Sequence, residues 1–180
     1  MACFSKESVE NEDLDWWILM MGGICLYRKP SILAADLDWL QARGYETKLF
    51  KCSGWNSESE MHAELALRLG FPSYYGNNLN ALNDCLIEDV LISDVGGLVL
   101  VLEQYDRFTR GRELEEPRDI EGSAHALLDI CARASRNHML QGRRFIVLVQ
   151  SDDPLICFEE LDRVGATWNP REWMNRDRGL

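Results

Sequence analysis

Two uninterrupted apolar runs constrain the fold of this chain more than any other feature of its sequence. Leu98–Leu102 follows a pair of glycines, and Phe145–Val149 follows a pair of arginines. A strand that is buried on both faces has this continuous apolar pattern, which is typical of parallel sheets covered by helices. The sequence therefore predicts buried strands at 98–103 and 145–150.

The segments around these runs have the spacing of amphipathic helices. Apolar residues recur at helical intervals between Pro30 and Gly44, and again in three later segments, 57–69, 77–87 and 123–138. A further strand is expected at 45–52. Strands that alternate with helices indicate a mainly parallel sheet. We therefore expect an α/β fold with a short, mainly parallel β-sheet flanked by helices.

The beginning of the chain has a different pattern. The apolar runs Trp16–Met21 and Ile24–Tyr27 flank two glycines, and this arrangement predicts a β-hairpin. We interpret residues 1–44 as an N-terminal hairpin-plus-helix addition to the sheet, and residues 45–150 as the main domain.

The end of the chain, residues 151–180, is interpreted as a C-terminal extension because it has no clear period. Within it, Cys157-Phe158 is expected to add an edge strand. Trp168 and Trp173 either dock on the domain or form a second interface. The charged stretch 106–119 is interpreted as a connector between the strand at 98–103 and the next helix.

Charge narrows the class of partner. The formal net charge of −11 at pH 7 would repel nucleic acid and anionic membranes, so we expect no direct binding to either and a basic protein as partner. The uncharged stretch Trp16–Tyr27 is too short to cross a membrane. Acidic residues precede it, where a signal peptide would be basic. A cytoplasmic location is expected.

The cysteines and glycines carry no motif of a cofactor site. The six cysteines stand more than 20 residues apart, whereas a zinc site needs clustered thiolates and a disulfide framework is typical of short secreted chains. No glycine-rich phosphate-binding motif occurs. We expect no cofactor and no metal, and we expect most of the cysteines to be small core residues.

The segment Phe71–Leu86 is the most unusual in the chain. Pro72 ends the preceding helix, Gly76 permits a sharp turn, and Asn77 or Asn78 can cap the next helix through its side chain. The leucines of that helix, Leu79, Leu82 and Leu86, are expected to face the core.

The opposite face of the same helix is acidic. Asn80, Asp84 and Glu88 are four residues apart and form a ridge that faces outward. Between Leu69 and Asp106 there are six acidic residues and no Lys, Arg or His. Such a ridge can accept hydrogen bonds from Arg and Lys of a partner. The alternative is an ordinary solvated face of a surface helix.

The string Leu-Gly-Phe-Pro-Ser-Tyr-Tyr-Gly-Asn-Asn-Leu-Asn-Ala-Leu-Asn-Asp-Cys-Leu at 69–86 resembles the signature of the barstar family of intracellular ribonuclease inhibitors. The resemblance covers about residues 45–150. It implies the barstar fold and a loop and helix that plug the active site of a secreted ribonuclease. It also implies that Asp84 matches the central aspartate, which occupies the phosphate site of the enzyme. The implied partner-binding residues are Tyr74, Tyr75, Gly76, Asn78, Asn80, Asn83, Asp84 and Glu88.

Four positions depart from the family pattern. Asn80 replaces a second aspartate, Asn83 and Asp89 replace aromatic residues, and Ala132 replaces a peripheral glutamate on the later helix. Such carboxylates and aromatic residues are frequent hot spots of protein interfaces.

The resemblance implies a function without catalysis. We expect a stoichiometric inhibitor of a basic, barnase-like ribonuclease that binds through the acidic loop and helix at 74–89. The alternative is an immunity or binding protein on the same scaffold for a different, non-ribonuclease toxin. A third class, a small hydrolase that uses Cys85 or His62, would need a pocket that contains both the thiol and the imidazole.

Overall fold

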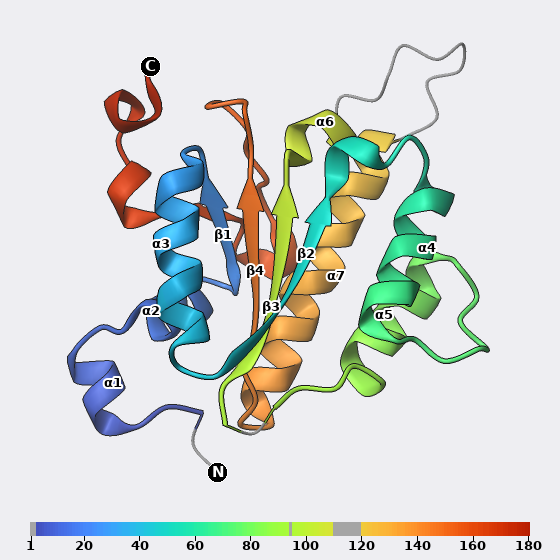
Figure 1. The fold of residues 1–180 in the computed structure, drawn as a ribbon, viewed down its shortest axis with the longest axis horizontal. Coiled ribbons are helices and arrows are strands. Elements are labelled where there is room, and N and C mark those ends of the chain that lie inside the picture. The colour runs from blue at the N-terminus through green and yellow to red at the C-terminus, as the bar shows by residue number, and fades with distance from the viewer. Residues whose placement is uncertain (1–2, 94, 110–119) are drawn as a thin grey trace.

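The computed structural model describes residues 3–93, 95–109 and 120–180. A five-stranded sheet with the strand order β2-β3-β4-β1-β5 runs through the centre of the molecule (Figure 1), and all of its paired strands are parallel. The strands are β1 (Ile24–Tyr27), β2 (Tyr45–Lys51), β3 (Gly97–Glu103), β4 (Phe145–Gln150) and β5 (Thr167–Trp168). The predicted α/β class with a parallel sheet is confirmed.

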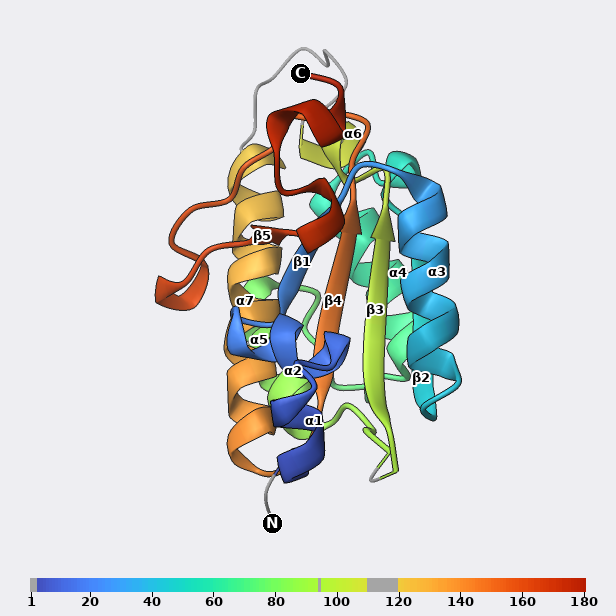
Figure 2. The same cartoon turned by 90° about the vertical axis from the view of Figure 1, so that its left-hand side faces the viewer.

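Helices cover both faces of this sheet. Helix α7 lies on one side of the strands and α3 on the other (Figure 2), as expected for continuous apolar strands that bury both faces. The helices are α1 (Lys6–Glu10), α2 (Leu14–Met20), α3 (Pro30–Gln41), α4 (Glu58–Leu69), α5 (Leu79–Glu88), α6 (Tyr105–Thr109) and α7 (Ile120–Leu140).

The core consists of two clusters, one on each face of the sheet. Alternate residues of β3 enter opposite clusters: Leu100 packs with α4, α5 and α7, and Val101 packs with α2 and α3. Four of the six cysteines are buried, as the sequence predicts. Gly96 lets β2 approach β3 closely, because a Cβ atom there would lie 2.2 Å from the carbonyl oxygen of Gly44.

The predicted N-terminal hairpin is wrong. Leu14–Met20 forms helix α2, and β1 lies inside the sheet between β4 and β5, parallel to both. A short apolar run does not distinguish a buried strand from one face of a helix. Gly23 joins the two elements with a positive φ of 84°, and a Cβ atom there would lie 2.0 Å from the hydroxyl oxygen of Ser135. The division of the chain at residues 44 and 150 stays a prediction.

The predicted edge strand at Cys157-Phe158 is also wrong. The edge strand in this part of the chain is β5, ten residues later, and Phe158 instead enters the core with its ring 5.8 Å from that of Tyr105. The predicted connector begins as helix α6, and the rest of it, residues 110–119, lies outside the described residues.

Residues 151–180, the predicted C-terminal extension, are fixed to the rest of the fold by buried polar contacts. The carboxylate of Glu172, which is fully buried, accepts hydrogen bonds from the backbone N–H groups of Arg28 and Lys29, both at 2.9 Å. The side-chain amide of Asn169 donates to Asp36 of α3 at 2.7 Å. The extension therefore docks on the domain, although the side chain of Trp173 stays 56% exposed.

Candidate functional site

The turn before α5 is closed by its own side chains. Asn78 caps the helix: its side-chain oxygen accepts a hydrogen bond from the backbone N–H of Ala81 at 3.0 Å, and its amide donates to the carbonyl of Gly76 at 3.1 Å. A Cβ atom on Gly76 would lie 2.8 Å from that amide nitrogen, so the glycine leaves room for it. Asn77 takes a positive φ of 47°, which asparagine tolerates better than most residues. The loop and α5 thus form one locally ordered unit.

Helix α5 presents the ridge predicted from the sequence. Leu82, Cys85 and Leu86 are buried against the core, whereas Asn80, Asp84 and Glu88 are exposed. The expectation that this ridge faces outward is confirmed. The amide of Asn83 donates to a carboxylate oxygen of Asp84 at 3.2 Å.

Tyr74 stands at the end of the same ridge. Its side chain is 73% exposed, and its hydroxyl lies 3.0 Å from both carboxylate oxygens of Asp89. This hydrogen bond raises the pKa of Tyr74, so the phenol stays protonated and donates at neutral pH. An aromatic side chain is therefore held over the acidic end of α5.

Tyr75 points the other way, into the protein. It is 9% exposed, its ring lies 4.9 Å from that of Phe71, and its hydroxyl lies within hydrogen-bonding distance of Nδ1 of His62 on α4. Nε2 of His62 lies 3.3 Å from a carboxylate oxygen of Glu58. Since a carboxylate only accepts, Nε2 donates to Glu58 and Nδ1 accepts from Tyr75. This chain of contacts ties the loop to α4.

Comparison with protein families agrees with the signature and the fold. The model of the family described as Barstar (barnase inhibitor) matches residues 35–150, which include α4, the loop and α5. The chain belongs to the barstar family. A comparison with curated proteins gave no match. Membership of this family implies a barnase-inhibitor-like, protein-binding role.

Ala132, which replaces a peripheral glutamate of the barstar pattern, does not lie at the periphery in this structure. Ala132 is 3% exposed and belongs to the core, so it does not stand at the rim of the α5 surface. Its neighbour on α7, Arg133, does reach the exposed side of α5: its Nη1 lies 3.4 Å from the side-chain oxygen of Asn83. Sequence reasoning missed this contact because 50 residues separate its partners.

The positions of Cys85 and His62 do not support the alternative that the protein is a hydrolase. Cys85 is 2% exposed, and burial raises the pKa of its thiol to about 11, so it is not a thiolate at neutral pH. Both ring nitrogens of His62 are occupied by Tyr75 and Glu58 rather than by Cys85.

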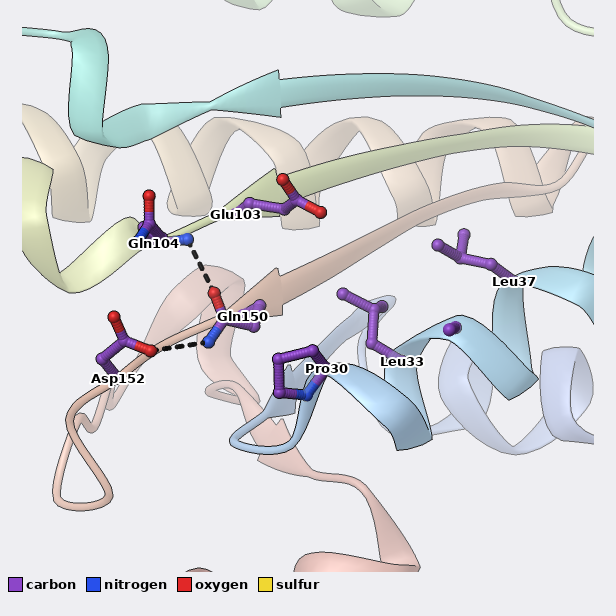
Figure 3. A pocket seen from close by; sticks show the side chains of 8 residues that line it. Pro30, Leu33, Leu37, Glu103, Gln104, Gln150 and Asp152 are labelled. Carbon is purple, nitrogen blue, oxygen red and sulfur yellow. Dashed lines mark hydrogen bonds between the residues drawn. The ribbon is translucent and has the colours of Figure 1, made fainter.

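A pocket of about 270 Å³ lies at the carboxyl ends of β3 and β4, under α3 (Figure 3). Three of its polar residues are linked by hydrogen bonds: Gln150 accepts from the backbone N–H of Gln104 at 2.9 Å and donates to Asp152 at 3.2 Å. None of its lining residues is Cys or His; they are Pro30, Leu33, Ala34, Leu37, Glu103, Gln104, Gln150 and Asp152.

The described ranges hold neither a candidate metal site nor a candidate membrane span. Residues 3–93, 95–109 and 120–180 contain no group of three or more His, Cys, Asp or Glu residues that could hold a metal ion. In the same part of the chain, no helix is both long and apolar enough for a membrane span.

His62 and His138 are buried, and we expect acid to lower the stability of the protein because both must gain a proton. Burial lowers the pKa of His62, with Glu58 opposing it, and burial also lowers the pKa of His138, which has an unpartnered Nδ1 among the described residues. A lowered pKa in the folded state means that the unfolded state binds more protons near the ordinary value of 6.5. The stabilisation is therefore present above about pH 6.5 and is lost as the pH falls.

We expect the melting temperature to fall between pH 7.5 and pH 5.5, as measured by circular dichroism. The control is His125→Gln, a substitution at an exposed histidine, which should leave the size of this fall unchanged. A melting temperature that stays constant over this range in the wild-type protein would contradict the assignment of buried neutral histidines.

Proposed function

We propose that the chain is a stoichiometric inhibitor of a basic, barnase-like secreted ribonuclease, and that it acts in the cytoplasm of the producing cell. The observation that carries the proposal is the ridge of Asn80, Asp84 and Glu88, exposed on a self-capped helix in a member of the barstar family. A carboxylate and a phosphate both accept paired hydrogen bonds from arginine. The loop and α5 would therefore occupy the site where the enzyme binds RNA phosphate.

Each site residue has a distinct role in this proposal. Asp84 is the anchor, because it is exposed and lies in the middle of the ridge. Tyr74 adds an aromatic contact that Asp89 holds in place. Asn80, Asn83 and Glu88 make surrounding polar contacts.

In this proposal, the main role of the loop residues before α5 is to hold the loop and the helix in place. Gly76 and Asn78 close the turn before α5. Tyr75 is buried, and its hydroxyl contacts His62, so it supports the loop from below instead of meeting the partner through its side chain.

The net charge supports fast association. A chain of net charge −11 with its ridge of carboxylates attracts a basic enzyme over distance, and salt screens this attraction. An inhibitor that protects its own cell benefits from binding before the enzyme acts.

The second candidate is a different client on the same scaffold. Asn80 removes a carboxylate, and Asn83 and Asp89 remove two aromatic contacts that the barstar signature has. Losses of this kind change which partner fits. An immunity protein for a non-ribonuclease toxin would keep the acidic ridge and the fold.

A competition experiment tests the plugging mechanism. We expect the complex of a barnase-like ribonuclease with this protein to lose binding of a short, uncleavable fluorescent oligonucleotide, as followed by anisotropy. Bovine serum albumin, another acidic protein, serves as the control and should leave oligonucleotide binding intact. Simultaneous binding of inhibitor and oligonucleotide would contradict the proposed plug and leave only a remote contact.

A further inference from the structure

A cation stands beside the acidic ridge. The side chain of Arg133 on α7 is 47% exposed, and its two terminal nitrogens lie 2.9 Å from Asp129 and 3.4 Å from Asn83. Asn83 in turn donates to Asp84 at 3.2 Å. The guanidinium is thus separated from the proposed anchor by a single side chain.

This guanidinium remains available to a partner. Its ion pair with Asp129 joins residues four apart on an exposed helix face, and pairs of this kind contribute little to stability. A guanidinium has five N–H donors, and two contacts leave most of them free for a carboxylate. The binding face is therefore bipolar, with acid on α5 and an exposed cation at its border with α7.

We infer that Arg133 determines the specificity of this face, which fits a partner that presents a carboxylate next to the cationic groups that meet Asp84. The inference rests on the proposed function and names the chemistry of its partner. A rim that is basic throughout would bring its own cations against Arg133, and like charges in an interface are costly. A carboxylate at that place would form a paired hydrogen bond with the guanidinium.

Arg136 supplies a matched control on the same helix. Its side chain is 49% exposed, close to the value for Arg133, but its partner is Asp162 at 3.0 Å, and it has no described contact with α5. Reversing either arginine changes the net charge by the same amount. A difference between the two variants therefore reports position and not total charge.

The experiment compares Arg133→Glu, Arg133→Gln and Arg136→Glu with the wild type against a barnase-like ribonuclease whose active-site rim is basic. Inhibition constants and dissociation rates are measured at about 150 mM salt. We expect Arg133→Glu to tighten inhibition about tenfold and slow dissociation, Arg133→Gln to give a smaller gain, and Arg136→Glu to change the constant less than threefold. A second arm uses ribonuclease variants with single rim Lys or Arg residues changed to Glu, and at least one of them should prefer the wild-type inhibitor to Arg133→Glu.

The outcomes separate the inference from the proposed function. Inhibition that responds equally to Arg133→Glu and Arg136→Glu would overturn the inference and leave the inhibitor function standing. No inhibition by the wild type and by all variants would overturn the proposed function and the inference with it. Inhibition by Arg133→Glu alone would support the inference directly, since removal of the cation would then admit the basic enzyme.

Discussion

Replacing Asp84 by alanine is expected to weaken binding to the client ribonuclease by about 30-fold or more. The carboxylate is exposed in the middle of the α5 ridge, and the proposal places it in the phosphate site of the enzyme. Its loss would leave buried arginine or lysine side chains of the enzyme without a partner. Truncating one member of such a pair costs about 2–5 kcal/mol, a magnitude taken from studies that include the barnase–barstar complex of this same family.

The matched control for this prediction is Asn80→Ala, one turn earlier on the same ridge. It removes a neutral side chain, so we expect less than a tenfold loss of affinity. Both constants come from inhibition assays at low and moderate salt, and circular dichroism verifies that both variants fold. Equal and small losses would show that Asp84 is not the anchor.

The second large effect concerns the stability of the C-terminal extension. We expect Glu172→Ala to lower the free energy of unfolding by about 2–4 kcal/mol, because it leaves two N–H groups at the start of α3 without an acceptor. Both hydrogen bonds are 2.9 Å long, and the Glu172 side chain is fully buried. Urea denaturation measures the change.

Glu159→Ala is the control for Glu172→Ala, since Glu159 lies in the same extension but is exposed. Its effect should stay within about 0.5 kcal/mol of the wild type. A loss below 1 kcal/mol for Glu172→Ala would mean that the extension adds little to the stability of the sheet. A large loss would show that β1, α3 and the extension unfold together with the rest of the domain.

The sequence predicts the centre of this fold better than its ends. β3 and β4 are continuous apolar runs, and burial on both faces requires such runs. Their positions can therefore be read directly from the local sequence. The cap at Asn78 and the outward ridge follow from local chemistry, which acts within a few residues. Ser57 likewise caps α4, since its hydroxyl accepts a hydrogen bond from the backbone N–H of Glu60.

The wrong predictions lie where contacts between residues far apart in the sequence determine the secondary structure. Helix α2 and β1 are short apolar segments, and only their packing against α7 and the sheet distinguishes helix from strand. β5 has two residues and pairs with β1, more than 140 positions earlier, so no local pattern marks it. The contact of Tyr75 with His62 and that of Arg133 with Asn83 also join different elements, and periodicity does not report them.

The central claim is that this member of the barstar family inhibits a ribonuclease by one-to-one binding. Its most direct test is a titration of a barnase-like ribonuclease with the wild-type protein, with hydrolysis of a fluorogenic RNA substrate as the readout. We expect activity to fall linearly and to reach its minimum at one inhibitor per enzyme. Activity that stays unchanged at a tenfold excess of the wild-type protein would contradict one-to-one inhibition.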